Sequence, residues 1–220
     1  MSLLEVIALD AKDAEAAQAG GANRLELVAD MAADGLTPSV RTFRDAASAT
    51  DLPIRVMLRD APGFAPGDLR ELRRAAAELR EAGATEFVLG FLDADGEIDE
   101  GVCLNLLAEL EGCRWTFHRA LDNSRDVRRS WGVVGALGCD TVLAAGSAKG
   151  VADGLPVLRD LAQWQDRVHL LVGGGLKREH VPALRDAGVT GFHVGSAVRP
   201  GGWGAPLDAG AVREWVDCLV

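Results

Sequence analysis

Short apolar runs alternate with longer segments of helical spacing along the whole chain. This alternation is typical of parallel strands that are joined by crossover helices. Eight segments have the length and composition of strands, and we predict them at Leu3–Leu9, Arg24–Val28, Ile54–Leu58, Glu86–Gly90, Trp115–His118, Thr141–Ala145, Val168–Val172 and Gly191–Gly195.

The segments between these strands carry helix signals. Asp10 is placed to cap a helix that runs through Ala19, and Thr37 followed by Pro38 is expected to open the next helix. A third helix has apolar residues at spacings of three and four, which places them on one face. These residues are Leu69, Leu72, Ala76 and Leu79.

A repeated βα unit explains this order best. A glycine follows several helical segments just ahead of the next strand, as at Gly21 and Gly83, where a left-handed helix cap is expected. Eight parallel strands in an open sheet would leave two edges to cover, whereas a ring has none. We therefore predict an α/β fold, a single (β/α)8 (TIM) barrel with short loops over residues 1–220, with a doubly wound open sheet as the alternative.

Composition and charge limit the partners. The 220 residues are 48% hydrophobic and 25% charged, as in ordinary globular proteins, and the net charge is −10. Nucleic acid and anionic membranes are poor partners for such a chain, because both require a basic surface. The first ten residues lack the basic and apolar segments of a signal peptide, so we expect a cytoplasmic protein.

In a barrel of this kind, functional side chains gather where the strands end. Strand alternation turns Arg24 and Glu26 toward the barrel interior, where each requires a charged partner. The candidate partners are Glu5 on the first strand, Arg55 or Arg59 on the third, and His118 and Arg119 at the end of the fifth. These charges either form a purely structural ion network or belong to a site.

His118 is the best acid or base candidate, because imidazole titrates near neutral pH and this residue ends a strand. Arg119 and Asp122 follow in the same loop, so three polar groups share one rim. The other histidines, including His193, are interpreted as structural.

Small residues follow the last three predicted strands. Glycines allow the backbone to approach an anion, and (β/α)8 barrels often bind phosphate at these loops. The residues that we expect to contact the anion are Ser147, Gly174, Gly175 and Ser196. The alternative is that these glycines serve turn geometry alone.

The four cysteines, Cys103, Cys113, Cys139 and Cys218, are widely spaced and form no CxxC motif. We expect free thiols and assign no metal ligand.

Five motifs in order along the chain resemble the CutC family. They are LLEV from Leu3, GGANRLEL from Gly20, DGLTPS from Asp34, VMLR from Val56 and TFHRALD from Thr116. The resemblance implies a (β/α)8 barrel, a cytoplasmic homodimer and a role in copper tolerance.

This sequence departs from the family pattern at two places. Members often carry a cysteine in the first strand and another after the second motif, where this chain has Ile7 or Ala8 and Val28. Cu(I) prefers sulfur ligands. The residues carried over are charged or imidazole groups, which suit a small anionic molecule better: Glu5, Arg24, Glu26, Arg59, His118, Arg119 and Asp122.

Three functions follow. The chain acts in copper homeostasis with a polar pocket at the carboxyl end of the barrel; it is an enzyme on a small phosphorylated or carboxylated metabolite; or it is an inert dimeric scaffold. In the enzyme hypothesis, His118 moves a proton, Arg24, Arg59 and Arg119 hold the anion, and Glu26 or Asp122 orients the imidazole.

Overall fold

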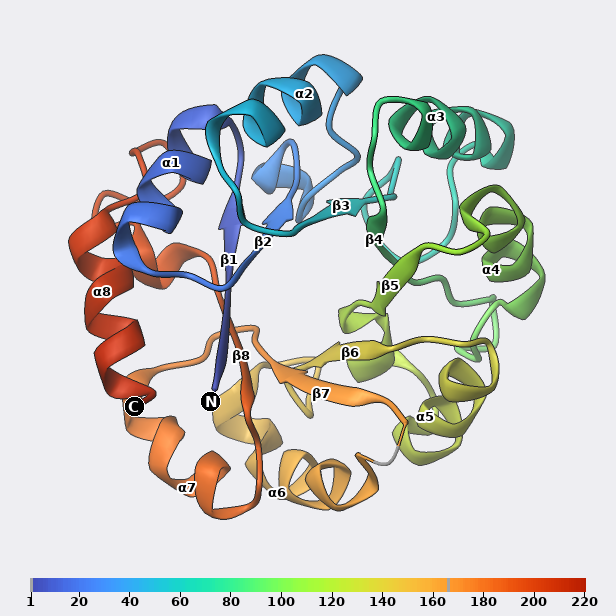
Figure 1. Ribbon diagram of the computed structural model, residues 1–220. Helices are drawn as coiled ribbons and strands as arrows, with labels where there is room; N and C mark the ends of the chain where they lie inside the picture. Colours follow the sequence, from blue (N-terminus) through green and yellow to red (C-terminus); the bar gives the residue numbers. More distant parts are fainter. Residues whose placement is uncertain (1, 166) are drawn as a thin grey trace.

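The eight predicted strands close into one ring of parallel strands, surrounded by helices (Figure 1). The computed structural model describes residues 2–165 and 167–220. Each strand pairs with its neighbours in chain order, and β1 pairs with β8, so the sheet has no free edge. The predicted TIM barrel is confirmed, and the open sheet is excluded.

The strands begin within one residue of the predicted positions and end one residue earlier in most cases. They are β1 Leu3–Ala8, β2 Arg24–Leu27, β3 Ile54–Met57, β4 Glu86–Leu89, β5 Arg114–Phe117, β6 Thr141–Ala144, β7 His169–Val172 and β8 Gly191–Val194.

The α-helices lie outside the ring. They are α1 Ala11–Gly20, α2 Val40–Ala49, α3 Leu69–Glu81, α4 Glu100–Leu107, α5 Val127–Ala136, α6 Val151–Leu161, α7 Val181–Asp186 and α8 Ala209–Cys218. Short 3-10 helices complete the connections at η1 Met31–Ala33, η2 Ala108–Leu110, η3 Arg119–Asn123, η4 Ala162–Trp164, η5 Arg178–His180 and η6 Ser196–Val198. None of the described helices has the length and apolar character needed to cross a membrane.

The cap at Asp10 is confirmed, because its side chain accepts a hydrogen bond from the Asp13 amide. The start predicted for the second helix is wrong. α2 begins at Val40 with Ser39 as its cap, and the Thr37 hydroxyl instead bonds the backbone amide and carbonyl of Arg59. Thr37 therefore fixes the loop after β3 rather than a helix start.

The main hydrophobic core lies between the ring and the helices. Strand residues such as Leu25, Phe87 and Phe192 point outward and are fully buried there. From α3, the predicted stripe contributes Leu72, Ala76 and Leu79 as buried side chains, while Leu69 is partly exposed.

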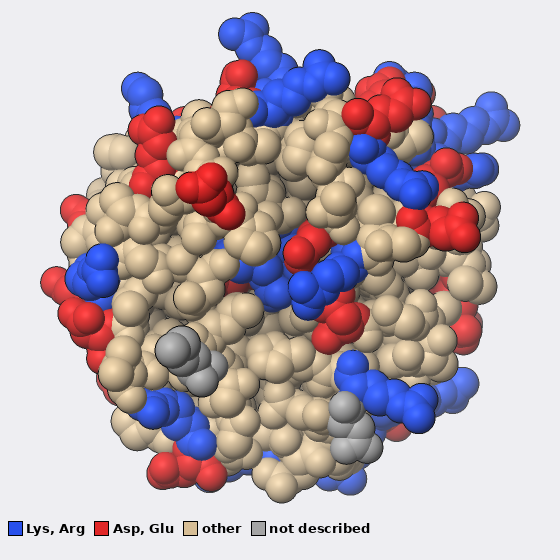
Figure 2. All heavy atoms as spheres, viewed as in Figure 1, with Lys and Arg blue, Asp and Glu red and all other residues tan. Residues whose placement is uncertain are grey.

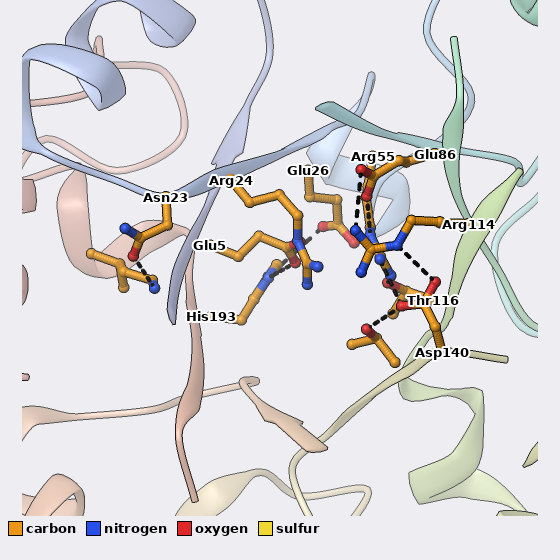
Figure 3. Close-up of polar contacts among 12 residues, drawn as sticks. Glu5, Asn23, Arg24, Glu26, Arg55, Glu86, Arg114, Thr116, Asp140 and His193 are labelled. Carbon is orange, nitrogen blue, oxygen red and sulfur yellow. Dashed lines mark hydrogen bonds and ion pairs between the residues drawn. The ribbon is translucent and has the colours of Figure 1, made fainter. Parts of the chain in front are cut away.

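The ring interior holds charged side chains toward the amino-terminal ends of the strands. The fully buried Arg55 donates to Glu86 at 2.9 Å and to Asp140 at 2.7 Å, and Arg114 lies beside both carboxylates (Figure 3). We call these four residues the amino-end network. Figure 2 shows acidic and basic side chains together at the centre of the barrel face. A small apolar cluster of Ile7, Val28, Met57 and Val88 forms a separate group of buried residues.

Candidate functional site

A cavity of about 460 Å³ lies among the segments that follow the strands, at their carboxyl ends. We call it the mouth cavity. Its polar lining residues are Glu26, Asp34, Arg59, His118, Arg119, Asn123, His193 and Ser196, and the glycines Gly174, Gly175 and Gly195 also line it. The apolar lining includes Ile7, Met57, Leu143 and Trp203.

Glu26 and His193 form the floor of the mouth cavity, because they lie within strands β2 and β8 while the other polar lining residues follow strands. We call them the floor pair. Oε2 of Glu26 lies 3.8 Å from Nε2 of His193, which is too far for a hydrogen bond. The histidine was interpreted from the sequence as structural, and its place in the lining was missed.

Glu5 holds His193 in place from below. The Nδ1 of His193 lies 2.8 Å from Oε1 of Glu5, and the guanidinium of Arg24 bonds the other carboxylate oxygen of Glu5 (Figure 3). Although burial opposes the effect, Arg24 and His193 lower the pKa of Glu5 to about 2. Glu5 is therefore ionised at neutral pH, so Nδ1 of His193 carries the proton of this hydrogen bond and leaves Nε2 toward Glu26.

Glu26 is a buried carboxyl group without the usual hydrogen bonds. Its side chain is 4% exposed, and Oε1 has no partner among the described residues. Burial, partly opposed by His193 and reinforced by Glu5, raises the pKa of Glu26 to about 7. Burial lowers the pKa of His193, but the carboxyl groups of Glu26 and Glu5 outweigh this effect and raise it.

Arg24 and Glu5 do not line the mouth cavity. They are buried beneath the floor pair, 5% and 0% exposed, and pair with each other. We predicted both residues to contact a ligand, and the structure instead places them where they support Glu26 and His193. The reason is strand register. Glu5 pairs with Arg24, and both lie two residues closer to the amino ends of their strands than the paired Ile7 and Glu26.

His118 directly follows β5 and lines the mouth cavity. Its Nδ1 accepts a hydrogen bond from the Ala120 amide, so the proton of the neutral ring is on Nε2, which has no partner among the described residues. Burial and the nearby Arg59 charge lower the pKa of His118 to about 3. The ring is therefore a neutral N–H donor at physiological pH rather than a group that titrates near neutrality.

Asp122 does not orient His118, contrary to our prediction. Its carboxylate accepts hydrogen bonds from the backbone amides of Ala145 and Gly146, which directly follow β6. It also accepts one from Nε of Arg119 at 2.9 Å. Burial raises its pKa, while these donors oppose the change. Asp122 is thus a positioning residue for Arg119, not a partner of the imidazole, and no hydrogen bond joins Glu26 to His118 either.

Two arginines reach the mouth cavity from the loops that follow β3 and β5. Arg59 is 5% exposed, donates to the carbonyl groups of Asp34 and Gly63, and lies over the ring of Phe64. Arg119 is more open, with a side chain that is 33% exposed. Of the two, Arg119 is better placed to meet a ligand.

The glycines after β7 make room for side chains as well as backbone. A Cβ atom on Gly174 would lie 2.5 Å from Nε of Arg119, and one on Gly173 would lie 2.8 Å from the ring of His193. Gly174 has φ of +89°, a conformation that also favours glycine. Of the four residues that we predicted to contact an anion, Gly174, Gly175 and Ser196 line the mouth cavity, and Ser147 lies outside its lining.

Trp203 covers the β8 side of the mouth cavity. It packs under the guanidinium of Arg199, which in turn is bound to the buried carboxylate of Asp13. Gly195 faces the indole so closely that a Cβ atom there would lie 2.6 Å from it. The loop after β8 is therefore anchored to α1 and holds an aromatic wall.

Copper fits this lining poorly. Two thioethers, from Met31 and Met57, line the mouth cavity, but none of the four cysteines does. Cys103 and Cys139 are buried elsewhere, and burial raises the pKa of both thiols to about 12. Cu(I) sites rely on thiolate or several thioether donors.

Among the described residues, one group has the donor atoms that a harder cation would require. Donor atoms of Glu5, Glu26 and His193 all lie within 4.8 Å of one another. However, Arg24 already supplies a positive charge to Glu5, and Nδ1 of His193 is occupied by the same carboxylate. This arrangement suits a proton between Glu26 and His193 better than a metal ion, and we assign no metal ligand.

Comparisons with known proteins agree with the fold and motifs. The family model described as the CutC family matches residues 2–198. The chain is 34% identical to a CutC family protein from Bacteroides thetaiotaomicron over 86% of this chain and 78% of that one, and 33% identical to a mouse protein named as a copper homeostasis protein cutC homolog over 87% and 72%. The crystal structure of a putative copper homeostasis protein CutC from Streptococcus agalactiae has a TM-score of 0.82 at 26% identity, covering 89% of this chain and 98% of that chain.

Proposed function

This chain belongs to the CutC family, and from that premise we propose that it binds a small anionic molecule in the mouth cavity and acts in copper homeostasis through that molecule. The anion is a phosphorylated or carboxylated metabolite. Copper itself is not held in the cavity in this proposal, because the lining lacks thiolates.

The observation that carries the proposal is a buried donor without a partner beside two arginines in the lining of one cavity. The Nε2–H group of His118 has no partner among the described residues, and Arg59 and Arg119 line the same cavity with Gly174 and Gly175. Arg119 is held by Asp122 through Nε, and its other contacts with the described residues are long, 3.3 and 3.4 Å from Nη2 to the carbonyls of Ser147 and Ala148. Donors of this kind bind phosphate and carboxylate oxygens, and a bidentate guanidinium contact adds geometric selectivity. Arg119 is already paired with Asp122, whereas Arg59 donates only to carbonyl groups among the described residues, so an anion would add the carboxylate or phosphate contact that Arg59 lacks.

The donor set also supports an enzymatic role as a second candidate function. A neutral imidazole N–H can stabilise a negative oxygen that develops on a bound ligand, as oxyanion donors do. In this version His118 gives a hydrogen bond rather than a proton, which differs from the acid or base role expected from the sequence. The supporting observation is its hydrogen bond from Ala120, which fixes the tautomer.

A ligand screen tests anion binding. Purified protein is heated with inorganic phosphate, a sugar phosphate or a dicarboxylate, each with EDTA present. At a ligand concentration of 100 times Kd, binding should stabilise the fold by about 2.7 kcal/mol and raise Tm by several degrees. Arg119→Met should abolish the rise, while Arg70→Met on the exposed face of α3 should keep it.

Copper is tested separately with the reduced protein. In a competition titration against a Cu(I) chelator, we expect no stoichiometric tight binding. Tight binding of one Cu(I) per chain would contradict the proposal that the protein acts on copper only through another molecule. The absence of a Tm rise with every anion would contradict anion binding in the mouth cavity.

The homodimer implied by the family stays a proposal. Among the described residues, only Leu104 and Val220 are large exposed apolar side chains, so a dimer interface would be mainly polar. The inert scaffold alternative predicts that neither anions nor copper shift Tm, and the same screen decides it.

A further inference from the structure

The floor of the mouth cavity contains a carboxyl group and an imidazole whose free atoms face each other. Nε2 of His193 and Oε2 of Glu26 are 3.8 Å apart, and Oε1 of Glu26 has no hydrogen-bond partner among the described residues. A buried carboxylate in this state is costly, because ionised groups in protein interiors require hydrogen bonds or counter-charges. Nothing in the proposed anion site explains this pair.

We propose that Glu26 and His193 titrate as one coupled pair, which holds one exchangeable proton on either residue, and form the acid–base pair of the mouth cavity. The coupling follows from the 3.8 Å separation of two buried ionisable groups, which is too long for a hydrogen bond but short for two charges. The use of this proton on a ligand rests on the proposed function, since the ligand must be held above the floor by the arginines and His118.

The surroundings favour a proton that stays within the pair. Glu5 on β1 fixes the imidazole through Nδ1, and Arg24 on β2 neutralises Glu5. The charge of Arg55 on β3 acts on Glu5, and the charge of Arg59, two residues after β3 ends, acts on Glu26. With Glu5 matched by Arg24, the floor pair has one negative carboxylate, one imidazole and one proton to distribute. The raised pKa of Glu26, about 7, agrees with this count.

The pair gives the cavity a way to move a proton to or from a ligand. Glu26 accepts a proton from an acidic C–H or O–H group, so an O–H bond forms on Glu26 and the electron pair stays on the ligand. The Nε2–H group of His118 donates to the ligand oxygen that gains charge. Return of the proton from Glu26, or by way of His193, restores the protein without any other reactant.

Carbon-13 NMR of the carboxyl groups tests the pair in the wild-type protein, in a buffer free of phosphate and other candidate ligands. We expect the Glu26 signal, assigned by its loss in Glu26→Gln, to titrate near neutral pH. Titration in the ordinary range of about 4.3 would overturn the proposal. This measurement requires only the wild-type fold to be intact across the titration.

Proton NMR of the histidine rings provides the reciprocal test. In the wild type, the His193 signal should move in two steps, as coupled groups do. In Glu26→Gln the midpoint should fall by about one pH unit or more, because the carboxylate that favours the imidazolium is gone. Glu214→Gln, on the exposed face of α8, is the matched control and should leave His193 unchanged. An unchanged midpoint in Glu26→Gln would overturn the proposal.

A cation titration separates a proton from a metal ion at the floor. Isothermal titration with Mn²⁺ or Zn²⁺ alone should show no tight site that depends on Glu26. Stoichiometric binding that disappears in Glu26→Gln would overturn the assignment. The anion screen fails or succeeds independently of these measurements. If Glu26 titrates near neutral pH but no anion raises Tm, only the proposed function is rejected.

Discussion

Nδ1 of His193 lies 2.8 Å from Oε1 of Glu5, across the seam where the last strand of the barrel meets the first. The two residues are 188 positions apart in the chain. Their contact fixes which nitrogen of His193 faces the mouth cavity. The closure of the ring is therefore part of the site and not only of the scaffold.

Gly174 and Gly175 form a matched pair for testing the anion loop. Both have positive φ, so alanine at either position should cost about 1–2 kcal/mol of stability. Only Gly174→Ala adds an atom against Arg119. We expect Gly174→Ala to weaken binding of the anion found in the screen about tenfold beyond Gly175→Ala, about 1.4 kcal/mol, in a calorimetric titration. Equal affinities would show that Arg119 does not depend on this glycine.

The amino-end network should contribute stability mainly through the buried Arg55. Arg55→Met leaves Glu86 and Asp140 without their buried counter-charge and should lower the free energy of unfolding by about 3–5 kcal/mol in urea. Arg114→Met is the control, because this arginine is 65% exposed and its contacts are 3.7 and 3.8 Å long, so the cost should stay below about 1 kcal/mol. Similar losses in the two variants would contradict this division.

His118 should make the protein sensitive to acid. Its pKa is about 3 in the fold and near 6.5 in the unfolded chain, so between these values the unfolded state binds more protons. The stability that wild type gains from neutral His118 is complete above about pH 6.5 and is lost as pH falls toward 3. Relative to His118→Asn, the wild-type free energy of unfolding should fall by up to about 1.4 kcal/mol per pH unit in this window. A constant difference from pH 7 to pH 4 would contradict a neutral ring.

The thiols should react in two classes. Cys103 and Cys139 are buried and hold their protons to a pKa of about 12, whereas Cys113 and Cys218 are partly exposed. At pH 8, an alkylating reagent followed by mass spectrometry should modify Cys113 and Cys218 first, and the other two only after denaturation. Early modification of Cys139 would indicate local opening near β6.

The barrel could be predicted from sequence because its signal is local and repeated. Each strand is a short apolar run with a glycine or cap close by, so errors remained within about one residue at the strand starts. The second helix was misplaced because Thr37 and Pro38 have the composition of a helix start, while the Thr37 hydroxyl is committed to Arg59 across the loop.

The site was only partly predictable, because its members come from opposite ends of the chain. Glu26, Arg59, His118 and Arg119 follow from strand ends and do line the mouth cavity. His193 was missed because its partner Glu5 becomes a neighbour only through ring closure. The alternation of side chains along the strand could have identified it, since His193 and Gly195 are two residues apart and therefore share the face that points inward.

The pairing of β1 with β8 also sets when the site can exist during synthesis. A nascent chain that has not yet emerged as far as Gly191 contains Glu5, Arg24 and Glu26 but no imidazole to face them. Until β8 inserts between β7 and β1, those charges are not enclosed by a complete ring, so a ligand can be captured only after β8 has emerged and joined the sheet.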